Sequence, residues 1–129
     1  MKHRCVLDAS AAAAVLFREP DSEVVGRHLF QVGGLVVPQL FELEVANVAR
    51  KKVLRNELGW ETARTCLAEL DTWPMEIAMV TWSQAWNVAR ESDLTLYDAA
   101  YLCLARRRQL ALLTLDRALQ MAAGTRSVL

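Results

Sequence analysis

The sequence predicts an α/β fold, a three-layer α/β/α sandwich with a central parallel sheet of about four to five strands. Short apolar runs alternate with helical segments along the chain, and inside the runs the apolar residues do not alternate with polar ones. Strands of that kind are buried on both faces, as in a parallel sheet covered by helices. At 129 residues, 53% of them hydrophobic, the chain is long enough to form a single domain over residues 1–129 with a well-filled core.

Helix-breaking and helix-capping residues divide the first half of the chain into helices and strands. The segment Pro20-Asp21-Ser22 separates an Ala-rich helix from a second helix, which Asp21 or Ser22 can cap. The pair Gly33-Gly34 then turns the chain into a second strand, and Pro38 ends that strand and suits the first turn of the next helix. These signals predict strands at residues 4–7 and 35–37 and helices at residues 10–17, 22–32 and 39–54.

The second half repeats the alternation. Pro74 closes a helix that begins near Gly59, and a strand follows it. Trp82, Trp86 and Ala89 recur at helical spacing, and we expect the two tryptophans to lie in the core. The predicted helices are residues 59–72, 82–91, 94–108 and 116–123, and the predicted strands are 76–80, 110–113 and, at an edge, 127–129.

Composition excludes several classes of protein. No apolar run reaches the roughly 18 residues of a membrane span, and residues 1–8 lack the apolar stretch of a signal peptide, so we expect a cytoplasmic protein without a membrane partner. The three cysteines have no Cys-x-x-Cys spacing and are expected to be buried, reduced thiols; with only two histidines, neither a zinc site nor a Ser-His-Asp triad has support. The net charge of zero gives no overall sign of a nucleic-acid partner, and the basic clusters at 50–55 and 106–108 also suit solvated helix ends.

Four acidic residues stand out by position, although each has a structural interpretation of its own. Asp8 follows the first strand and Asp116 follows the strand at 110–113, where either could simply cap the next helix, as Thr114 could for the last one. Asp98 is the only charged residue among residues 94–105, but its spacing from Thr95 is that of a capping box. Glu44, in the helix after the second strand, lies either on an exposed helix edge or in a cleft.

Taken together, the four acids favour a metal site. The carboxyl ends of parallel strands lie at one edge of a sheet, so Asp8, Asp98, Asp116 and Glu44 are expected to gather there. Gathered carboxylates repel one another unless a cation lies among them. Oxygen ligands without histidine or cysteine select Mg²⁺ or Mn²⁺, which activates water for attack on a phosphodiester. The sequence leaves open whether one or two ions bind.

Four motifs in chain order resemble the PIN-domain ribonucleases and, more narrowly, the VapC toxins of toxin–antitoxin pairs. They are Val6-Leu-Asp-Ala-Ser10, Pro38-x-Leu40-x-x-x-Glu44-Val-x-Asn47, Tyr97-Asp-Ala-Ala-Tyr101 and Thr114-x-Asp116. The resemblance covers essentially the whole chain and implies a PIN-like fold. It also implies an endoribonuclease that uses Mg²⁺, with Mn²⁺ as a possible substitute, to hydrolyse RNA with a metal-activated water.

The resemblance assigns roles to individual residues. It implies that Asp8, Glu44, Asp98 and Asp116 bind the metal and carry catalysis, with Glu44 either a ligand or the residue that orients the attacking water. Ser10, Asn47 and Thr114 match the polar residues that support those acids. Some members have one more acid soon after the fourth; Leu119 lies one turn on here, which leaves a second metal site without that ligand. The implied partners are RNA, a VapB-like antitoxin whose tail occludes the cleft, and a second copy in a homodimer or a larger toxin–antitoxin assembly.

Two further hypotheses remain open at the level of the sequence. Lys51 and Arg55 share a helical stripe with Glu44, and we expect them to hold RNA phosphates beside the metal. A non-catalytic interaction module with the same PIN fold is the alternative to an enzyme. A phospho-acceptor receiver domain and a haloacid-dehalogenase-like phosphatase fit less well, because Ala9 and Ser10 stand where those folds need acids and no lysine follows Lys52.

Overall fold

A parallel sheet forms the centre of the protein, in a computed structural model that describes residues 3–129. Within these residues the sheet has four strands in the order β3-β2-β1-β4. Val6, in the middle of β1, pairs with Val36 on one side and Leu112 on the other. The strands are β1 (Arg4–Leu7), β2 (Gly34–Val37), β3 (Met75–Ile77) and β4 (Ala111–Leu113).

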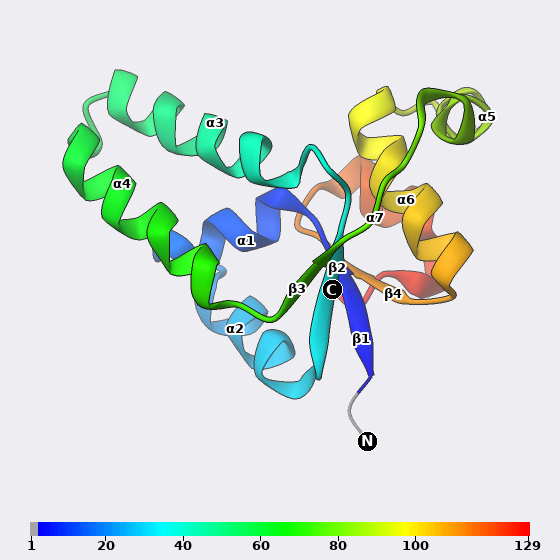
Figure 1. Cartoon of the computed structure of the whole chain (residues 1–129), viewed down its shortest axis with the longest axis horizontal. Helices are drawn as coiled ribbons and strands as arrows, with labels where there is room; N and C mark the ends of the chain where they lie inside the picture. The colour runs from blue at the N-terminus through cyan, green and yellow to red at the C-terminus, as the bar shows by residue number, and fades with distance from the viewer. Residues whose placement is uncertain (1–2) are drawn as a thin grey trace.

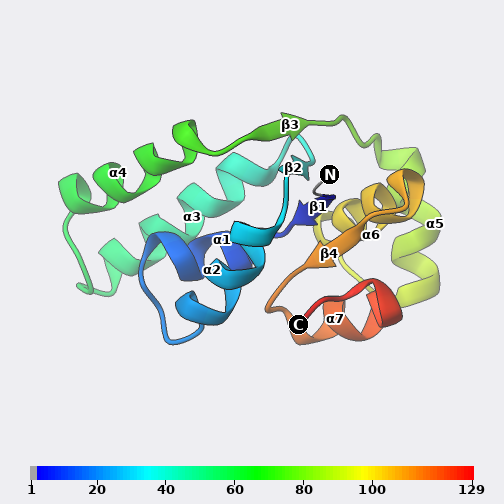
Figure 2. The ribbon, with the colours of Figure 1, turned by 90° about the horizontal axis from the view of Figure 1, so that it is seen from below.

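Helices cover both faces of the sheet and give the three layers that the sequence predicts. In both views α1 to α4 lie on one side of the sheet and α5 to α7 on the other, and α3 and α4 extend beyond it as a helical hairpin (Figure 1, Figure 2). Among residues 3–129 no helix is long and apolar enough to cross a membrane. The helices are α1 (Ala9–Leu16), α2 (Ser22–Gln31), α3 (Phe41–Leu54), α4 (Trp60–Ala68), α5 (Trp82–Ser92), α6 (Leu96–Arg108) and α7 (Arg117–Ala123), with 3₁₀ turns at Glu69–Thr72 and Gly124–Arg126.

The core is continuous from one helical layer through the sheet to the other. All four residues of β2 are buried, as are Cys5 to Leu7 in β1. In α1 the small side chains of Ala11 and Ala12 are fully buried in the same cluster. The run Ala99–Ala105 of α6 is buried throughout, so the middle of α6 is enclosed on all sides. A rigid, two-sided core of this kind holds the ends of the strands in fixed positions.

The third strand is shorter than predicted and begins earlier. It spans Met75–Ile77 instead of residues 76–80, because Pro38 ends its neighbour β2 directly after Val37. Beyond Val37 the Gln39 side chain makes the hydrogen bonds that a neighbouring strand would make. Its Nε2 donates to the Val80 carbonyl at 2.7 Å, and its Oε1 accepts from the Val80 N–H at 3.0 Å. At the opposite edge the predicted strand at 127–129 is reduced to a single parallel bridge between Ser127 and Leu112.

The prediction that the tryptophans lie in the core is wrong. Trp82 is 73% exposed and Trp86 is 54% exposed, and their rings meet edge to face with centroids 6.2 Å apart. Helix α5 packs on α6 through a side next to the tryptophans, where Ala85 is buried. The cysteine prediction is partly wrong as well: all three cysteines are free thiols, but Cys66 is only partly buried.

Candidate active site

The site begins at the carboxyl ends of β1 and β4, the two neighbouring strands where the order of the sheet reverses. The Asp8 N–H donates to the Leu113 carbonyl at 3.0 Å, which carries the β1–β4 ladder one residue past the strands. This ladder brings Asp8 beside Thr114, and both are buried polar side chains, 5% and 0% exposed. Crevices of this kind are where open parallel sheets bind ligands.

Two hydroxyl groups hold the Asp8 carboxylate. Ser10 Oγ and Thr114 Oγ1 each donate to Oδ2 of Asp8 at 2.6 Å. Both hydroxyl oxygens in turn accept a backbone N–H, Ser10 from Leu115 at 3.0 Å and Thr114 from Asp116 at 3.0 Å. Because every donor in this network has a partner, the buried carboxylate keeps one orientation.

The helix-cap interpretation holds for Asp116, holds only in part for Asp98, where no bond from the Thr95 N–H to the Asp98 carboxylate completes a capping box, and does not hold for Asp8. Oδ1 of Asp116 accepts the Leu119 N–H at 2.8 Å, so Asp116 caps α7. Thr95 Oγ1 accepts the Asp98 N–H at 3.1 Å and thereby caps α6, with Asp98 in its first turn. Asp8 precedes α1 but makes no side-chain cap bond. Local structure therefore explains the positions of Asp98 and Asp116, whereas Asp8 is fixed by the hydroxyl network.

Glu44 reaches the site from α3 and has a partner that the sequence interpretation did not assign. The Tyr101 hydroxyl donates to Oε1 of Glu44 at 2.5 Å. Tyr101 is fully buried in α6, one turn after Asp98. That spacing was a usable signal, because residues three apart on a helix lie on the same side.

All four acids line one pocket of about 210 Å³, although they come from four different parts of the chain. Asn47 and Lys51 line it too, one and two turns along α3 from Glu44. Arg55 is not among the described residues that line it; its side chain pairs with Glu57 at 3.0 Å. The remaining residues that line the pocket are Ala9, Ser10 and Val48.

Burial and mutual repulsion raise the pKa of three of these carboxyl groups. Burial is the main cause for Asp8, Glu44 and Asp98 alike. Negative neighbours add to it: Asp116 acts on Asp8 and on Asp98, while Asp8 and Asp98 act on Glu44. The hydroxyl bonds oppose the shift by stabilising the charged forms. The pocket thus concentrates negative charge that a cation would neutralise.

The chemistry of these donors fits a hard divalent cation. The pocket offers carboxylate oxygens and the Asn47 amide, the ligand types that Mg²⁺ and Mn²⁺ prefer. Across residues 3–129, however, no three His, Cys, Asp or Glu side chains are arranged closely enough to hold a metal ion as they stand. The metal-binding role of the acids therefore stays a prediction, supported by shared lining of one pocket and by the raised pKa values.

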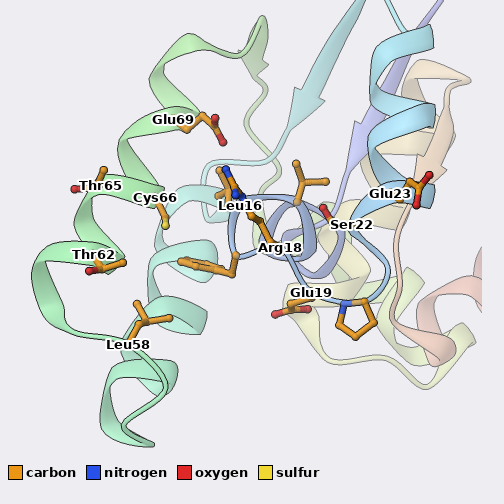
Figure 3. Close-up of a pocket in the computed structure, with 13 residues that line it drawn as sticks. Leu16, Arg18, Glu19, Ser22, Glu23, Leu58, Thr62, Thr65, Cys66 and Glu69 are labelled. Carbon is orange, nitrogen blue, oxygen red and sulfur yellow. The ribbon is translucent and has the colours of Figure 1, made fainter.

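A larger cavity of the described chain lies elsewhere. It measures about 860 Å³, and none of the four acids is among the described residues that line it. Figure 3 shows Thr62, Thr65 and Cys66 of α4, with Glu69 directly after the helix, on one wall, opposite Leu16 at the end of α1 and the start of α2. The four acids gather in the smaller pocket instead, so we assign the chemistry to that pocket.

Comparison with known proteins agrees with the fold and with the motifs. A family model described as the PIN domain matches residues 5–124. Ribonuclease VapC1 of Mycobacterium tuberculosis is 33% identical over 127 residues, covering 93% of this chain and 91% of its own. Ribonuclease VapC3 of Pyrobaculum aerophilum is 35% identical over 120 residues, covering 90% and 92%.

Solved structures show the same fold at lower identity. The crystal structure of PAE2754 from Pyrobaculum aerophilum matches with a TM-score of 0.73 and 24% identity, over 94% of this chain and 79% of that one. The structure of VapC20 from Mycobacterium tuberculosis, described as a toxin that cleaves the sarcin–ricin loop, matches with a TM-score of 0.71 and 16% identity, over 92% and 94%. At these identities the two structures support the assignment of the fold alone.

Proposed function

The chain belongs to the PIN-domain family, as a VapC-type member, and from this premise we propose that it is a Mg²⁺-dependent endoribonuclease toxin. One observation carries the proposal: Asp8, Glu44, Asp98 and Asp116, from four separate parts of the chain, line a single pocket at the carboxyl edge of the sheet. The relatives that are named ribonucleases support the same activity. In this proposal Mn²⁺ can replace Mg²⁺ as the cofactor.

We assign the ligand role to the four acids and a supporting role to the neutral polar groups. Asp8, Asp98 and Asp116 would hold the ion, and Glu44 would hold it or orient the attacking water. Ser10 and Thr114 keep Asp8 charged and correctly oriented by donating to its Oδ2. Asn47 lies where its amide would reach the ion or the RNA. A bound divalent cation supplies activation of water and neutralises charge on the phosphodiester.

Lys51 is the residue we assign to the RNA backbone. It is exposed and lines the pocket with the acids, where a cation would meet a phosphate on its way to the metal. Arg55, which the sequence grouped with Lys51, is a weaker candidate because Glu57 already holds its guanidinium.

The proposed partners are a VapB-like antitoxin that occludes the acid pocket and a second copy of the chain. An exposed apolar face made of Trp82, Trp86, Leu96 and Tyr97, here called the aromatic face, supports the homodimer. It borders a groove of about 440 Å³ and includes Tyr97, the neighbour of Asp98. Large exposed apolar patches mark interaction sites. A cytoplasmic location, a single domain over residues 1–129 and a larger toxin–antitoxin assembly complete the proposal.

An RNA cleavage assay tests the activity. The protein is incubated with RNA in Mg²⁺, in EDTA, and as the Asp98→Asn variant in Mg²⁺. We expect cleavage only in the first case. Asp93→Asn is the matched control, because Asp93 is exposed at the end of α5 with φ 53°, a conformation that asparagine accepts readily. Cleavage that is equal in all samples would reject the mechanism.

The alternative function, that of a non-catalytic PIN-fold interaction module, leads to different expected results. Such a protein would cut no RNA at any Mg²⁺ concentration, and Asp98→Asn would leave partner binding unchanged. The retention of all four acids and of the Ser10–Thr114 network favours the enzyme.

A further inference from the structure

Tyr101 makes the contact that joins α6 to α3 at the acid pocket. Its hydroxyl donates to Oε1 of Glu44 at 2.5 Å, across 57 positions of sequence. Tyr101 has 0% of its surface exposed and is among the largest fully buried side chains, whereas Glu44 is half-buried and lines the pocket. The bond therefore connects a residue of the rigid core to an acid of the site.

The position of Tyr101 on α6 links two of the acids. Asp98 and Tyr101 are three residues apart and lie on the same side of the helix. The Thr95 cap fixes the start of that helix, and the run Ala99–Ala105 is buried. One enclosed helix thus carries Asp98 itself and the hydroxyl that fixes Glu44, so the spacing between these two acids depends on the Tyr101–Glu44 bond.

Glu44 needs such a restraint more than the three aspartates do. Its side chain has three rotatable bonds, and the charges of Asp8 and Asp98 repel it from the place that the proposed chemistry requires. A hydrogen bond to a charged carboxylate is among the stronger ones in proteins. Because Tyr101 occupies Oε1, Oε2 remains for the pocket that Glu44 lines.

We propose that Tyr101 is a positioning residue, which fixes Oε1 of Glu44 so that the other carboxylate oxygen serves the metal or the attacking water. The inference rests on the proposed function, because it assigns Tyr101 a role in the same site. A purely structural tyrosine would satisfy its buried hydroxyl equally well on any backbone carbonyl, whereas this one acts on an acid of the pocket.

The Tyr101→Phe variant removes one hydroxyl and keeps the ring. We expect kcat for RNA cleavage to fall roughly tenfold to a hundredfold, with KM for RNA unchanged within about twofold. We also expect the affinity for Mn²⁺, measured by calorimetry without RNA, to fall about threefold or more. In a Glu44→Ala background, Tyr101→Phe should change neither quantity further, because residues that act through one another are not additive.

Thr72→Val is the matched control, since it also removes one hydroxyl, which donates to the Glu69 carbonyl at 2.7 Å away from the acid pocket and the aromatic face. We expect it to keep wild-type kcat and Mn²⁺ affinity. Glu44→Asp covers the case in which Tyr101→Phe folds poorly: it keeps the charge and the tyrosine but is one methylene too short to reach the phenol and the pocket together. We expect a comparable loss of kcat from Glu44→Asp.

Several results would overturn the inference. One is that Tyr101→Phe or Glu44→Asp keeps the kcat and the Mn²⁺ affinity of the wild type. Another is that Tyr101→Phe lowers kcat equally in the wild-type and Glu44→Ala backgrounds, which would mean that Tyr101 acts through the fold. If the wild-type protein cleaves no RNA, the proposed function fails, but the Mn²⁺ measurements still decide the role of Tyr101. Absence of Mn²⁺ binding by the wild type would overturn it too.

Discussion

Thr114 and Asp8 are 106 positions apart in the sequence, and the Thr114 hydroxyl donates a 2.6 Å hydrogen bond to Oδ2 of Asp8. The same hydroxyl accepts the Asp116 N–H, so one buried oxygen joins the end of β1 to the end of β4. Ser10 completes the arrangement from α1. The Asp8 carboxylate, which lines the pocket, is therefore held by groups at the ends of the sheet strands and at the start of α1.

Thr114→Val tests this relationship, because valine keeps the shape and removes the hydroxyl. The buried Asp8 loses one of its two hydroxyl donors, and the Asp116 N–H loses its acceptor. We expect the free energy of unfolding at pH 7 to fall by about 1–3 kcal/mol, measured by urea denaturation. The same substitution at the exposed Thr62 of α4 should change it by about 0.5 kcal/mol or less. Equal effects at both positions would contradict a special role for the Asp8 network.

The raised pKa values predict how stability depends on pH in the absence of divalent cations. Burial raises the pKa of Asp8, Glu44 and Asp98 above the values that these groups have in the unfolded chain. As the pH falls from 7 towards about 4, the folded state takes up protons before the unfolded state does, so these groups make the folded state more stable. Below the unfolded pKa values their contribution no longer changes.

The carboxyl group of Glu76 changes the stability at lower pH than Asp8, Glu44 and Asp98 do. Hydrogen bonds from Arg108 and Arg4 lower its pKa to about 2, so its contribution is present above about pH 4.5 and is lost only as the pH falls towards 2. We therefore expect thermal unfolding in EDTA to show a higher midpoint at pH 5 than at pH 7, with a smaller difference in Asp8→Asn. Addition of Mg²⁺ should raise the midpoint at pH 7 more than at pH 5. An identical pH profile for wild type and Asp8→Asn would contradict this account.

The sequence predicted the sheet and the neighbourhood of Asp8 well, because both follow from local patterns. Cys5 to Leu7 form an apolar run without alternation, and the acid that follows must then lie at the carboxyl edge of a parallel sheet. The VapC-type membership and the α/β/α fold are confirmed. The roles assigned to the acids and to Mg²⁺ stay predictions, which the cleavage assay addresses.

What the sequence did not predict depends on contacts between distant segments. The end of β3 is set by the side chain of Gln39, which takes the place of a neighbouring strand, and no local pattern in residues 76–80 shows this. The Tyr101–Glu44 bond joins α6 to α3 in the same way. The helical spacing of Trp82 and Trp86 identified a helix correctly but not which of its faces is buried.

The aromatic face leads to a prediction about assembly. Trp86→Glu replaces an apolar residue that is 54% exposed with a charged one, and should separate a homodimer without unfolding the monomer. We expect sedimentation velocity at micromolar concentration to show a dimer for the wild type and a monomer for the variant, with the same midpoint of thermal unfolding within a few degrees. Trp60→Glu is the control, since Trp60 is 61% exposed on α4, in the other helical layer. A monomeric wild type, or equal dissociation by both variants, would contradict the assignment of this face.

Substitution of the two neighbouring lysines of α3 distinguishes RNA binding at the acid pocket from general electrostatic attraction of RNA to the helix. Lys51 lines the acid pocket, whereas Lys52 makes a 2.9 Å ion pair with Glu19 and lies over the Phe17 ring. In an Asp98→Asn background that prevents cleavage, Lys51→Ala should weaken RNA binding and reduce the slope of log affinity against log salt by about 0.7, the value for one phosphate contact with a single strand. Lys52→Ala removes the same charge and should leave that slope unchanged.

Arg55→Ala belongs in the same series. The guanidinium bonds to Glu57, and Arg55 is not among the described residues that line the pocket, so we expect a smaller effect than for Lys51→Ala. Fluorescence anisotropy with a labelled RNA at several salt concentrations gives all three slopes. If Lys51→Ala and Lys52→Ala reduce the slope equally, the attraction is a property of the whole helix; if Lys51→Ala changes nothing, Lys51 does not contact the RNA backbone. A selective loss at Lys51 would place a phosphate at the mouth of the acid pocket, because Lys51 is exposed and lines that pocket together with the acids.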